Sequence, residues 1–151
     1  MKKFISVLTL IFLLSGCAST KQYVQNSDRN NSGNNYNNET MAQIYVLRPS
    51  SFGSAVTFKI YQDEKFIGEL GPNSYLSWQV DPANGKIEVI SKAENYAMIV
   101  ITPEVGKTYY IKQKVKMGWI MARTELEWLK EEEALEMLKK LKAPEIPNLI
   151  Q

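Results

Sequence analysis

Residues 55–80 read AVTFKIYQDEKFIGELGPNSYLSWQV and contain three short apolar segments separated by polar turns. Within them, Val56, Phe58 and Ile60 alternate with more polar residues, and Leu76, Trp78 and Val80 do the same. Successive side chains of a β-strand point to opposite faces of its sheet, so this alternation predicts strands with one buried and one solvated face.

The same pattern continues on both sides of this stretch, with turn residues every eight to twelve positions. The sequence therefore predicts an antiparallel β-sandwich, immunoglobulin-like or transthyretin-like, with seven or eight strands over residues 42–129. The expected strands cover residues 43–48, 55–62, 66–70, 75–80, 86–91, 96–102, 108–116 and 121–129.

Residues 130–151 form a C-terminal helix and tail in this interpretation, with the helix over 130–143. Leu135, Leu138 and Leu141 form an apolar stripe at helical spacing. The favoured hypothesis is that this stripe covers an open edge or end of the sandwich, and the alternative is that it binds a partner. We find no internal repeat and no second domain.

The first 17 residues, MKKFISVLTLIFLLSGC, have the character of an export signal. Lys2 and Lys3 precede an apolar run over residues 4–14. That run is too short for a transmembrane helix, which needs about 20 residues. Residues 1–16 are therefore predicted to be a secretory signal peptide.

The segment Leu14-Ser15-Gly16-Cys17 resembles the lipobox of bacterial lipoproteins, and Cys17 is the only cysteine of the chain. The resemblance implies that the Cys17 sulfur receives a diacylglyceryl group and that the signal is then cleaved before Cys17. The new amine is then acylated, for example with palmitate. The following Ala18-Ser19 is similar to the pattern that permits delivery to the outer membrane, facing the periplasm. In a cell without an outer membrane, the same anchor would hold the protein on the outer face of the plasma membrane.

Residues 17–41 comprise the lipidated cysteine and an Asn-rich stretch with almost no aliphatic side chains. Such a stretch cannot bury enough apolar surface to offset the entropy lost on ordering. We expect a disordered tether between the anchor and the sandwich.

Composition excludes several classes of site. The chain has no histidine and one cysteine, which excludes a Ser-His-Asp triad, a cysteine–histidine pair, an internal disulfide and a cysteine-based zinc site. We therefore expect no cofactor and no metal. Removing residues 1–16 leaves equal numbers of basic and acidic residues, so the composition does not support binding to nucleic acid.

Several motifs of the predicted sandwich are similar to a family of bacterial lipoproteins carrying domain of unknown function 2846. They are Ile44-Tyr45-x-x-Arg48-Pro49, the Lys59-Ile60-Tyr61 strand with Ile67-Gly68-Glu69-Leu70 after it, and Gly106-Lys107-Thr108-Tyr109-Tyr110. The resemblance covers roughly residues 42–128. It implies a small β-sandwich on a lipid anchor and implies no known catalytic residues.

Lys112, Lys114 and Lys116 share one face of an expected strand. They could bind anionic lipid headgroups or a cell-wall polymer. The favoured interpretation is a cross-strand charge ladder, because a hairpin turning near residue 119 would place Lys112 opposite Glu127 and Lys114 opposite Glu125.

Residues 117–121 form the most apolar turn of the chain and contain Trp119. The favoured interpretation places this turn in the core, beneath the C-terminal helix. The alternative is that it enters a membrane or holds a ligand, because turn tips are usually polar.

These observations predict a lipid-anchored protein of the cell envelope whose sandwich is a non-catalytic binding or accessory domain. Its candidate partners are the membrane, through Cys17, and an envelope protein or cell-wall polymer, through Trp119, Lys112, Lys114 and Lys116. The alternative is an exported enzyme that acts on envelope glycans with the carboxylates of Glu125 and Glu127. Flanking lysines would keep both carboxylates ionised, which favours the non-catalytic hypothesis.

Overall fold

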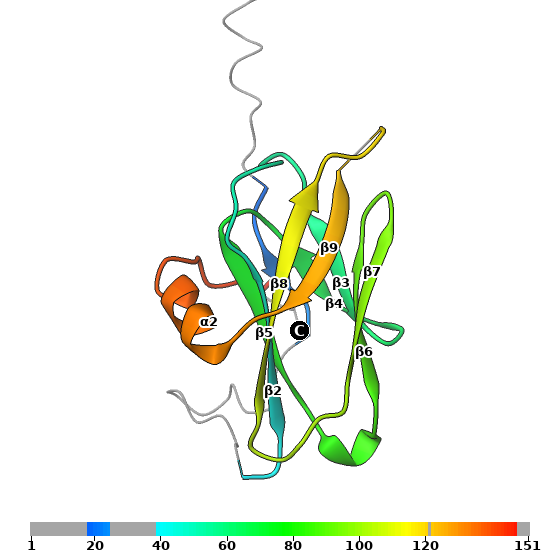
Figure 1. Ribbon diagram of the computed structural model, residues 1–151, viewed down its shortest axis with the longest axis vertical. Coiled ribbons are helices and arrows are strands. Elements are labelled where there is room, and N and C mark those ends of the chain that lie inside the picture. The colour runs from blue at the N-terminus through cyan, green and yellow to red at the C-terminus, as the bar shows by residue number, and fades with distance from the viewer. Residues whose placement is uncertain (1–17, 25–38, 121, 148–151) are drawn as a thin grey trace, which may run out of the picture.

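The computed structural model describes residues 18–24, 39–120 and 122–147, which form two β-sheets packed face to face with one helix outside them (Figure 1). The elements of these residues are β1 Lys21–Gln22, β2 Ala42–Arg48, β3 Phe58–Gln62, β4 Lys65–Leu70, β5 Ser74–Val80, the 3-10 helix η3 Pro82–Asn84, β6 Ile87–Lys92, β7 Tyr96–Ile101, β8 Thr108–Lys116, β9 Arg123–Trp128 and α2 Glu131–Leu138.

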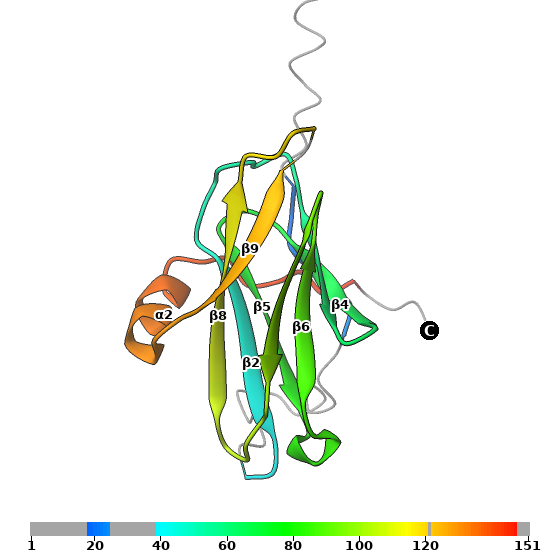
Figure 2. The same cartoon turned by 45° about the vertical axis from the view of Figure 1, so that its right-hand side comes forward.

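The strand order is β1-β4-β3-β6-β7 in the first sheet, called sheet A, and β5-β2-β8-β9 in the second, called sheet B. All neighbouring strands are antiparallel except β2 and β8, which run parallel. Figure 2 shows the two sheets side by side, with α2 on the outer side of sheet B. The predicted mainly β sandwich with a C-terminal helix is confirmed, and all eight expected strands are present.

The core lies between the two sheets, where the alternation predicted it. Phe58, Ile60, Leu76 and Trp78 are at most 1% exposed, while Lys59 between two of them is exposed. The indole nitrogen of Trp78 donates a hydrogen bond to Oε1 of Gln62 at 2.8 Å, which satisfies the one polar atom of this large buried side chain.

Arg48, at the end of β2, is completely buried. One of its terminal nitrogens donates to the carbonyl oxygens of Val56 and Leu70 at 2.7 and 3.2 Å. The other donates to the carbonyl oxygens of Phe52 and Gly53 at 3.0 and 2.9 Å. Burial lowers the pKa of Arg48 to about 10, so the side chain is still charged at neutral pH. These bonds attach residues 49–57, here called the β2–β3 loop, to the end of β4.

The expectation of a disordered tether is wrong for residues 18–24, which belong to the sandwich. Lys21 and Gln22 pair with Glu69 and Gly68 of β4, and Thr20 and Gln22 are 5% and 2% exposed. The backbone N–H of Gln22 also donates to the carbonyl oxygen of Glu145 at 2.9 Å. Residues 25–38 of the expected tether lie outside the described residues, as does Cys17, and residues 39–41 lead directly into β2.

Two glycines, Gly68 in β4 and Gly71 in the turn after β4, make room for this N-terminal segment. A Cβ atom on Gly68 would lie 2.2 Å from the carbonyl oxygen of Lys21, and one on Gly71 would lie 2.9 Å from the backbone nitrogen of Thr20. Such close backbone approach is possible only without a side chain.

The sequence predicts that the C-terminal helix covers an edge or end of the sandwich, and this prediction is wrong. The helix packs on the outer face of sheet B. Ala134 is fully buried, and Met137, Leu138 and Leu141 pack with it against Leu47, Tyr110 and their neighbours. Leu135, one of the three expected stripe residues, is 45% exposed. The helix also ends at Leu138, earlier than expected, because the chain turns there and the N–H of Lys142 bonds the carbonyl oxygen of Asn73 at 2.9 Å.

Replacing Arg48 by methionine should destabilise the protein strongly. The change removes donors from four carbonyl oxygens, and the expected loss is about 2–4 kcal/mol of unfolding free energy. Urea unfolding measures it. Lys59→Met, which removes an exposed charge from β3, should leave stability unchanged, and equal stability of the two variants would contradict the role given to Arg48.

Replacing Gly68 by alanine should release residues 18–24 from β4, because the new Cβ cannot share space with the Lys21 carbonyl. We expect faster hydrogen exchange at the Tyr23 amide, which donates to the Ile67 carbonyl at 2.8 Å, and a lower melting temperature. Glu69→Ala, at the next position, serves as the control because it shortens a side chain and adds no atom near the Lys21 carbonyl. Unchanged protection of Tyr23 in Gly68→Ala would show that the close approach is not needed.

Candidate functional site

The basic stripe predicted on β8 is part of a charge ladder with β9. The register places Lys112 opposite Glu127 and Lys114 opposite Glu125, as predicted. Lys112 Nζ lies 3.5 Å from Glu127 Oε1, Lys116 Nζ lies 3.1 Å from Glu125 Oε2, and Lys114 forms an ion pair with Glu127. Each of the three lysines therefore has a carboxylate beside it.

The electrostatics of the ladder keep its central carboxylate ionised. The hydrogen bond from Lys114 lowers the pKa of Glu127, and the same bond raises the pKa of Lys114. A general acid in glycoside hydrolysis needs a raised carboxyl pKa. Glu127 has the opposite shift, so the ladder favours a structural role over an acid catalyst.

The turn between β8 and β9 is exposed, and its expected place in the core is wrong. Met117, Trp119 and Ile120 are 82%, 94% and 86% exposed. The apolar surface that α2 needs is supplied instead by Leu47 and Tyr110, with Tyr45 and Tyr75 around them. The predicted partner-binding residue Trp119 is therefore available at the surface.

The hairpin tip between β6 and β7 holds this turn. The carboxylate of Glu94 accepts hydrogen bonds from the backbone N–H groups of Trp119 and Ile120 at 3.2 and 3.3 Å. Asn95 bonds both backbone groups of Thr124 in β9, each at 2.8 Å. These bonds hold the backbone of the turn in place while its apolar side chains face solvent.

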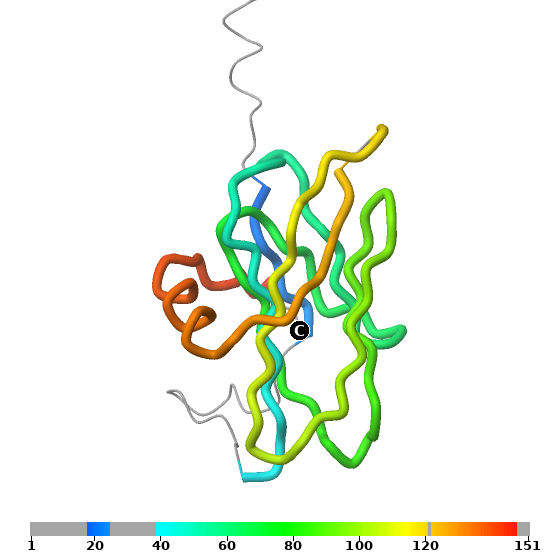
Figure 3. The backbone as a smooth tube through the Cα atoms, in the orientation of Figure 1, coloured from blue at the N-terminus to red at the C-terminus, as the bar shows by residue number. Residues whose placement is uncertain are grey.

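Phe52 is a further exposed apolar residue at the same end of the sandwich. It is 53% exposed and belongs to the β2–β3 loop, which lies near the β8–β9 turn in the tube view of Figure 3. A Cβ on the adjacent Gly53 would lie 3.3 Å from Cγ1 of Val115, close to the end of β8. Sequence analysis missed Phe52, although an aromatic residue within Ser50-Ser51-Phe52-Gly53-Ser54 is an unusual feature of a polar turn. We call Phe52, Met117, Trp119 and Ile120 the apolar tip.

A second exposed apolar area lies on the outer face of sheet A. Tyr96, Met98 and Val100 of β7 are 74%, 53% and 50% exposed. Tyr61 and Phe66, whose ring centroids are 5.3 Å apart, continue the area across β3 and β4. This area is on a side of the sandwich, whereas the apolar tip is at an end.

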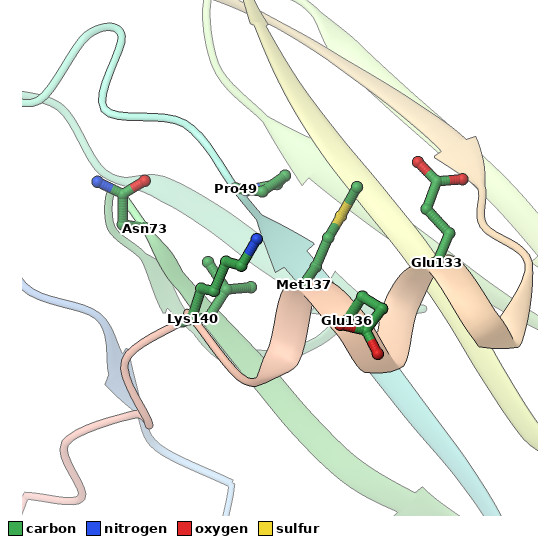
Figure 4. Close-up of a pocket in the computed structure, with 7 residues that line it drawn as sticks. Pro49, Asn73, Glu133, Glu136, Met137 and Lys140 are labelled. Atoms are coloured by element: carbon green, nitrogen blue, oxygen red, sulfur yellow. The ribbon is translucent and has the colours of Figure 1, made fainter.

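A groove of about 350 Å³ lies beside α2, between the helix and the connections that contain Pro49, after β2, and Asn73, before β5. Figure 4 shows Met137 and Lys140 extending from α2 on the side where Pro49 lies. Glu133 also lines it and lies 3.9 Å from Lys112, which connects the groove to the charge ladder.

Two further findings concern the described part of the chain. Within residues 18–24, 39–120 and 122–147, no helix has the length and apolar character required to cross a membrane. The same residues include no cluster of three or more Cys, Asp or Glu side chains placed to hold a metal ion.

The pairing of Glu127 with Lys114 predicts a specific pH dependence of stability. Because folding lowers the carboxyl pKa from its usual 4.5, the pair stabilises the folded state above that pH, and the contribution is lost as the pH falls through the lowered value. Glu127→Gln should therefore lose less stability than the natural chain between about pH 5 and about pH 2, as measured by urea unfolding.

Lys114→Gln should flatten the same pH profile, and the double variant should add little to either single change. A Glu127→Gln profile parallel to that of the natural chain would show that the ion pair contributes nothing to folding.

Comparison with known proteins shows the family to which the chain belongs. The chain is 29% identical over 123 residues to an uncharacterized protein of Haemophilus influenzae, covering 75% of this chain and 67% of that protein. No solved structure matches the chain. The family model described as protein of unknown function (DUF2846) matches residues 38–125, which include the Arg48-Pro49 motif, all of β8 and the first three residues of β9. The chain therefore belongs to the DUF2846 family.

Proposed function

We propose that this protein is a lipid-anchored component of the bacterial cell envelope whose β-sandwich is a non-catalytic binding or accessory domain. The anchor is Cys17, acylated after cleavage of the signal peptide over residues 1–16. The protein is attached to the outer membrane facing the periplasm, or to the outer face of the plasma membrane where no outer membrane exists.

The observation that carries the proposal is the character of the exposed surface. Its distinctive features are apolar side chains held outward at the apolar tip and on the outer face of sheet A. Large exposed apolar areas mark contacts with proteins or membranes more often than sites of chemistry. The ionic features on β8 and β9 pair with each other.

An exported carboxylate-dependent enzyme is the less well supported alternative. Glu125 and Glu127 are spaced along one strand face as such a pair would require, but the lowered pKa of Glu127 does not suit an acid catalyst. The groove beside α2 is lined by Glu133 and Glu136 together with Lys140.

The anchor is tested by replacing Cys17 with serine in the full chain. We expect the protein to move from the membrane fraction to the soluble fraction of the cell, because one thioether-linked diacylglyceryl group and one amide-linked acyl chain supply the binding. Ser15→Ala, which keeps a small residue in the lipobox, should leave the protein in the membrane fraction. Retention of Cys17→Ser in the membrane after a salt wash would contradict the proposal.

A further inference from the structure

The first described residues of the chain are bound firmly at one end of the sandwich. The backbone N–H of Gly71 donates to the Thr20 hydroxyl at 2.6 Å, and the N–H of Glu145 donates to the Thr20 carbonyl at 3.0 Å. A Cβ on Gly71 would lie 3.0 Å from the carbonyl oxygen of Ala18, so Ala18 lies directly against the turn between β4 and β5. Ala18 directly follows Cys17 in the sequence, so the proposed anchor would join the described chain at this turn.

The same end carries the apolar tip. In Figures 1 and 2 the blue segment that begins at residue 18, the β2–β3 loop and the β8–β9 turn all lie at one end of the sandwich, while η3 lies at the other. Hydrogen bonding connects them, because the N–H of Asn73, just after Gly71, donates to the carbonyl oxygen of Ser50 in the β2–β3 loop at 3.3 Å. An anchor at Cys17 would therefore bring this end of the molecule to the membrane.

The composition of this end suits the boundary between headgroups and acyl chains. Trp119 combines a large apolar ring with one N–H group, which is the character of side chains enriched at membrane interfaces. Lys116 and Arg123 face each other at the base of the turn, one on each strand. Lys116 is paired with Glu125, and Arg123 is the cation at this position that an anionic phosphate could bind.

We propose that the apolar tip inserts into the lipid bilayer to which Cys17 is anchored, so that the sandwich stands end-on at the membrane with Trp119 at the level of the headgroups. The inference rests on the anchor proposed above, because the anchor supplies the high local concentration of lipid that a few side chains need in order to bind. The outer face of sheet A then extends away from the bilayer and stays accessible to other molecules.

A photoreactive diazirine amino acid at single positions of the full chain tests this orientation in intact cells. Position 119 probes the tip. Position 105, where the natural Val105 is 59% exposed on the β7–β8 connection, probes the opposite end, and position 98 on β7 probes the side. Trypsin cleaves after Lys116 and Arg123, so the peptide 117–123 reports the tip, while the peptide 93–107 reports the other two positions.

We expect about tenfold more phospholipid adduct on the peptide 117–123 than on the peptide 93–107 from either control chain, since only the tip reaches the bilayer. A phospholipid adduct at position 98 equal to that at position 119 would show that the protein lies on its side, and the inference would be wrong. A protein adduct at position 119 in place of lipid, or no adduct there, would also overturn it.

The N-terminal peptide 17–21 of the same digest reports acylation of Cys17 separately. An acylated peptide with no lipid at position 119 would refute the inference and leave the proposed anchor intact. An unmodified peptide would refute the anchor, and the adduct at position 119 would still decide whether the tip meets lipid.

Discussion

A buried guanidinium group organises one end of this sandwich. Arg48 has no contact with water and binds four carbonyl oxygens from the β2–β3 loop and β4. A charged group in the interior needs partners, and those of Arg48 are the four carbonyl oxygens that its two terminal nitrogens bind, so the loop must keep the path that presents them. The position of Phe52, the contact between the loop and β8 and the surface on which the N-terminal segment lies all depend on this arrangement.

The strands and the β8–β9 register could be predicted because their signal is local. Each strand carries its own alternation, and the pairing of Lys112 with Glu127 needs only the position of one turn. β1 has two residues and no pattern of its own. The space for β1 is left by Gly68 and Gly71, which lie far from it in the sequence. A glycine in the sequence does not indicate which segment packs against it.

The sequence predicts that the Trp119 turn lies in the core, because the C-terminal helix needs an apolar surface and that turn is close to it in the sequence. The helix in fact covers Tyr45, Tyr75 and Tyr110, which alternate with core residues and so had the pattern of a solvated face. Stacking of Tyr45 on Tyr110, with centroids 5.4 Å apart, gives this face enough apolar area to support α2. Tyrosine is compatible with either side of a sheet, and the pattern alone does not separate the two cases.

The contact between the two ends of the chain affects the order of folding. Residues 20–22 lie at the start of the described chain, but they pair with Glu145, which lies close to its end. Bringing residues 20–22 and Glu145 together closes a loop of more than 120 residues, and this lowers the entropy of the chain before the contact forms. Residues 18–24 can pair with β4 as soon as Gly68 and Gly71 are in place, so the contact between β1 and Glu145 is the final part of this seam to close.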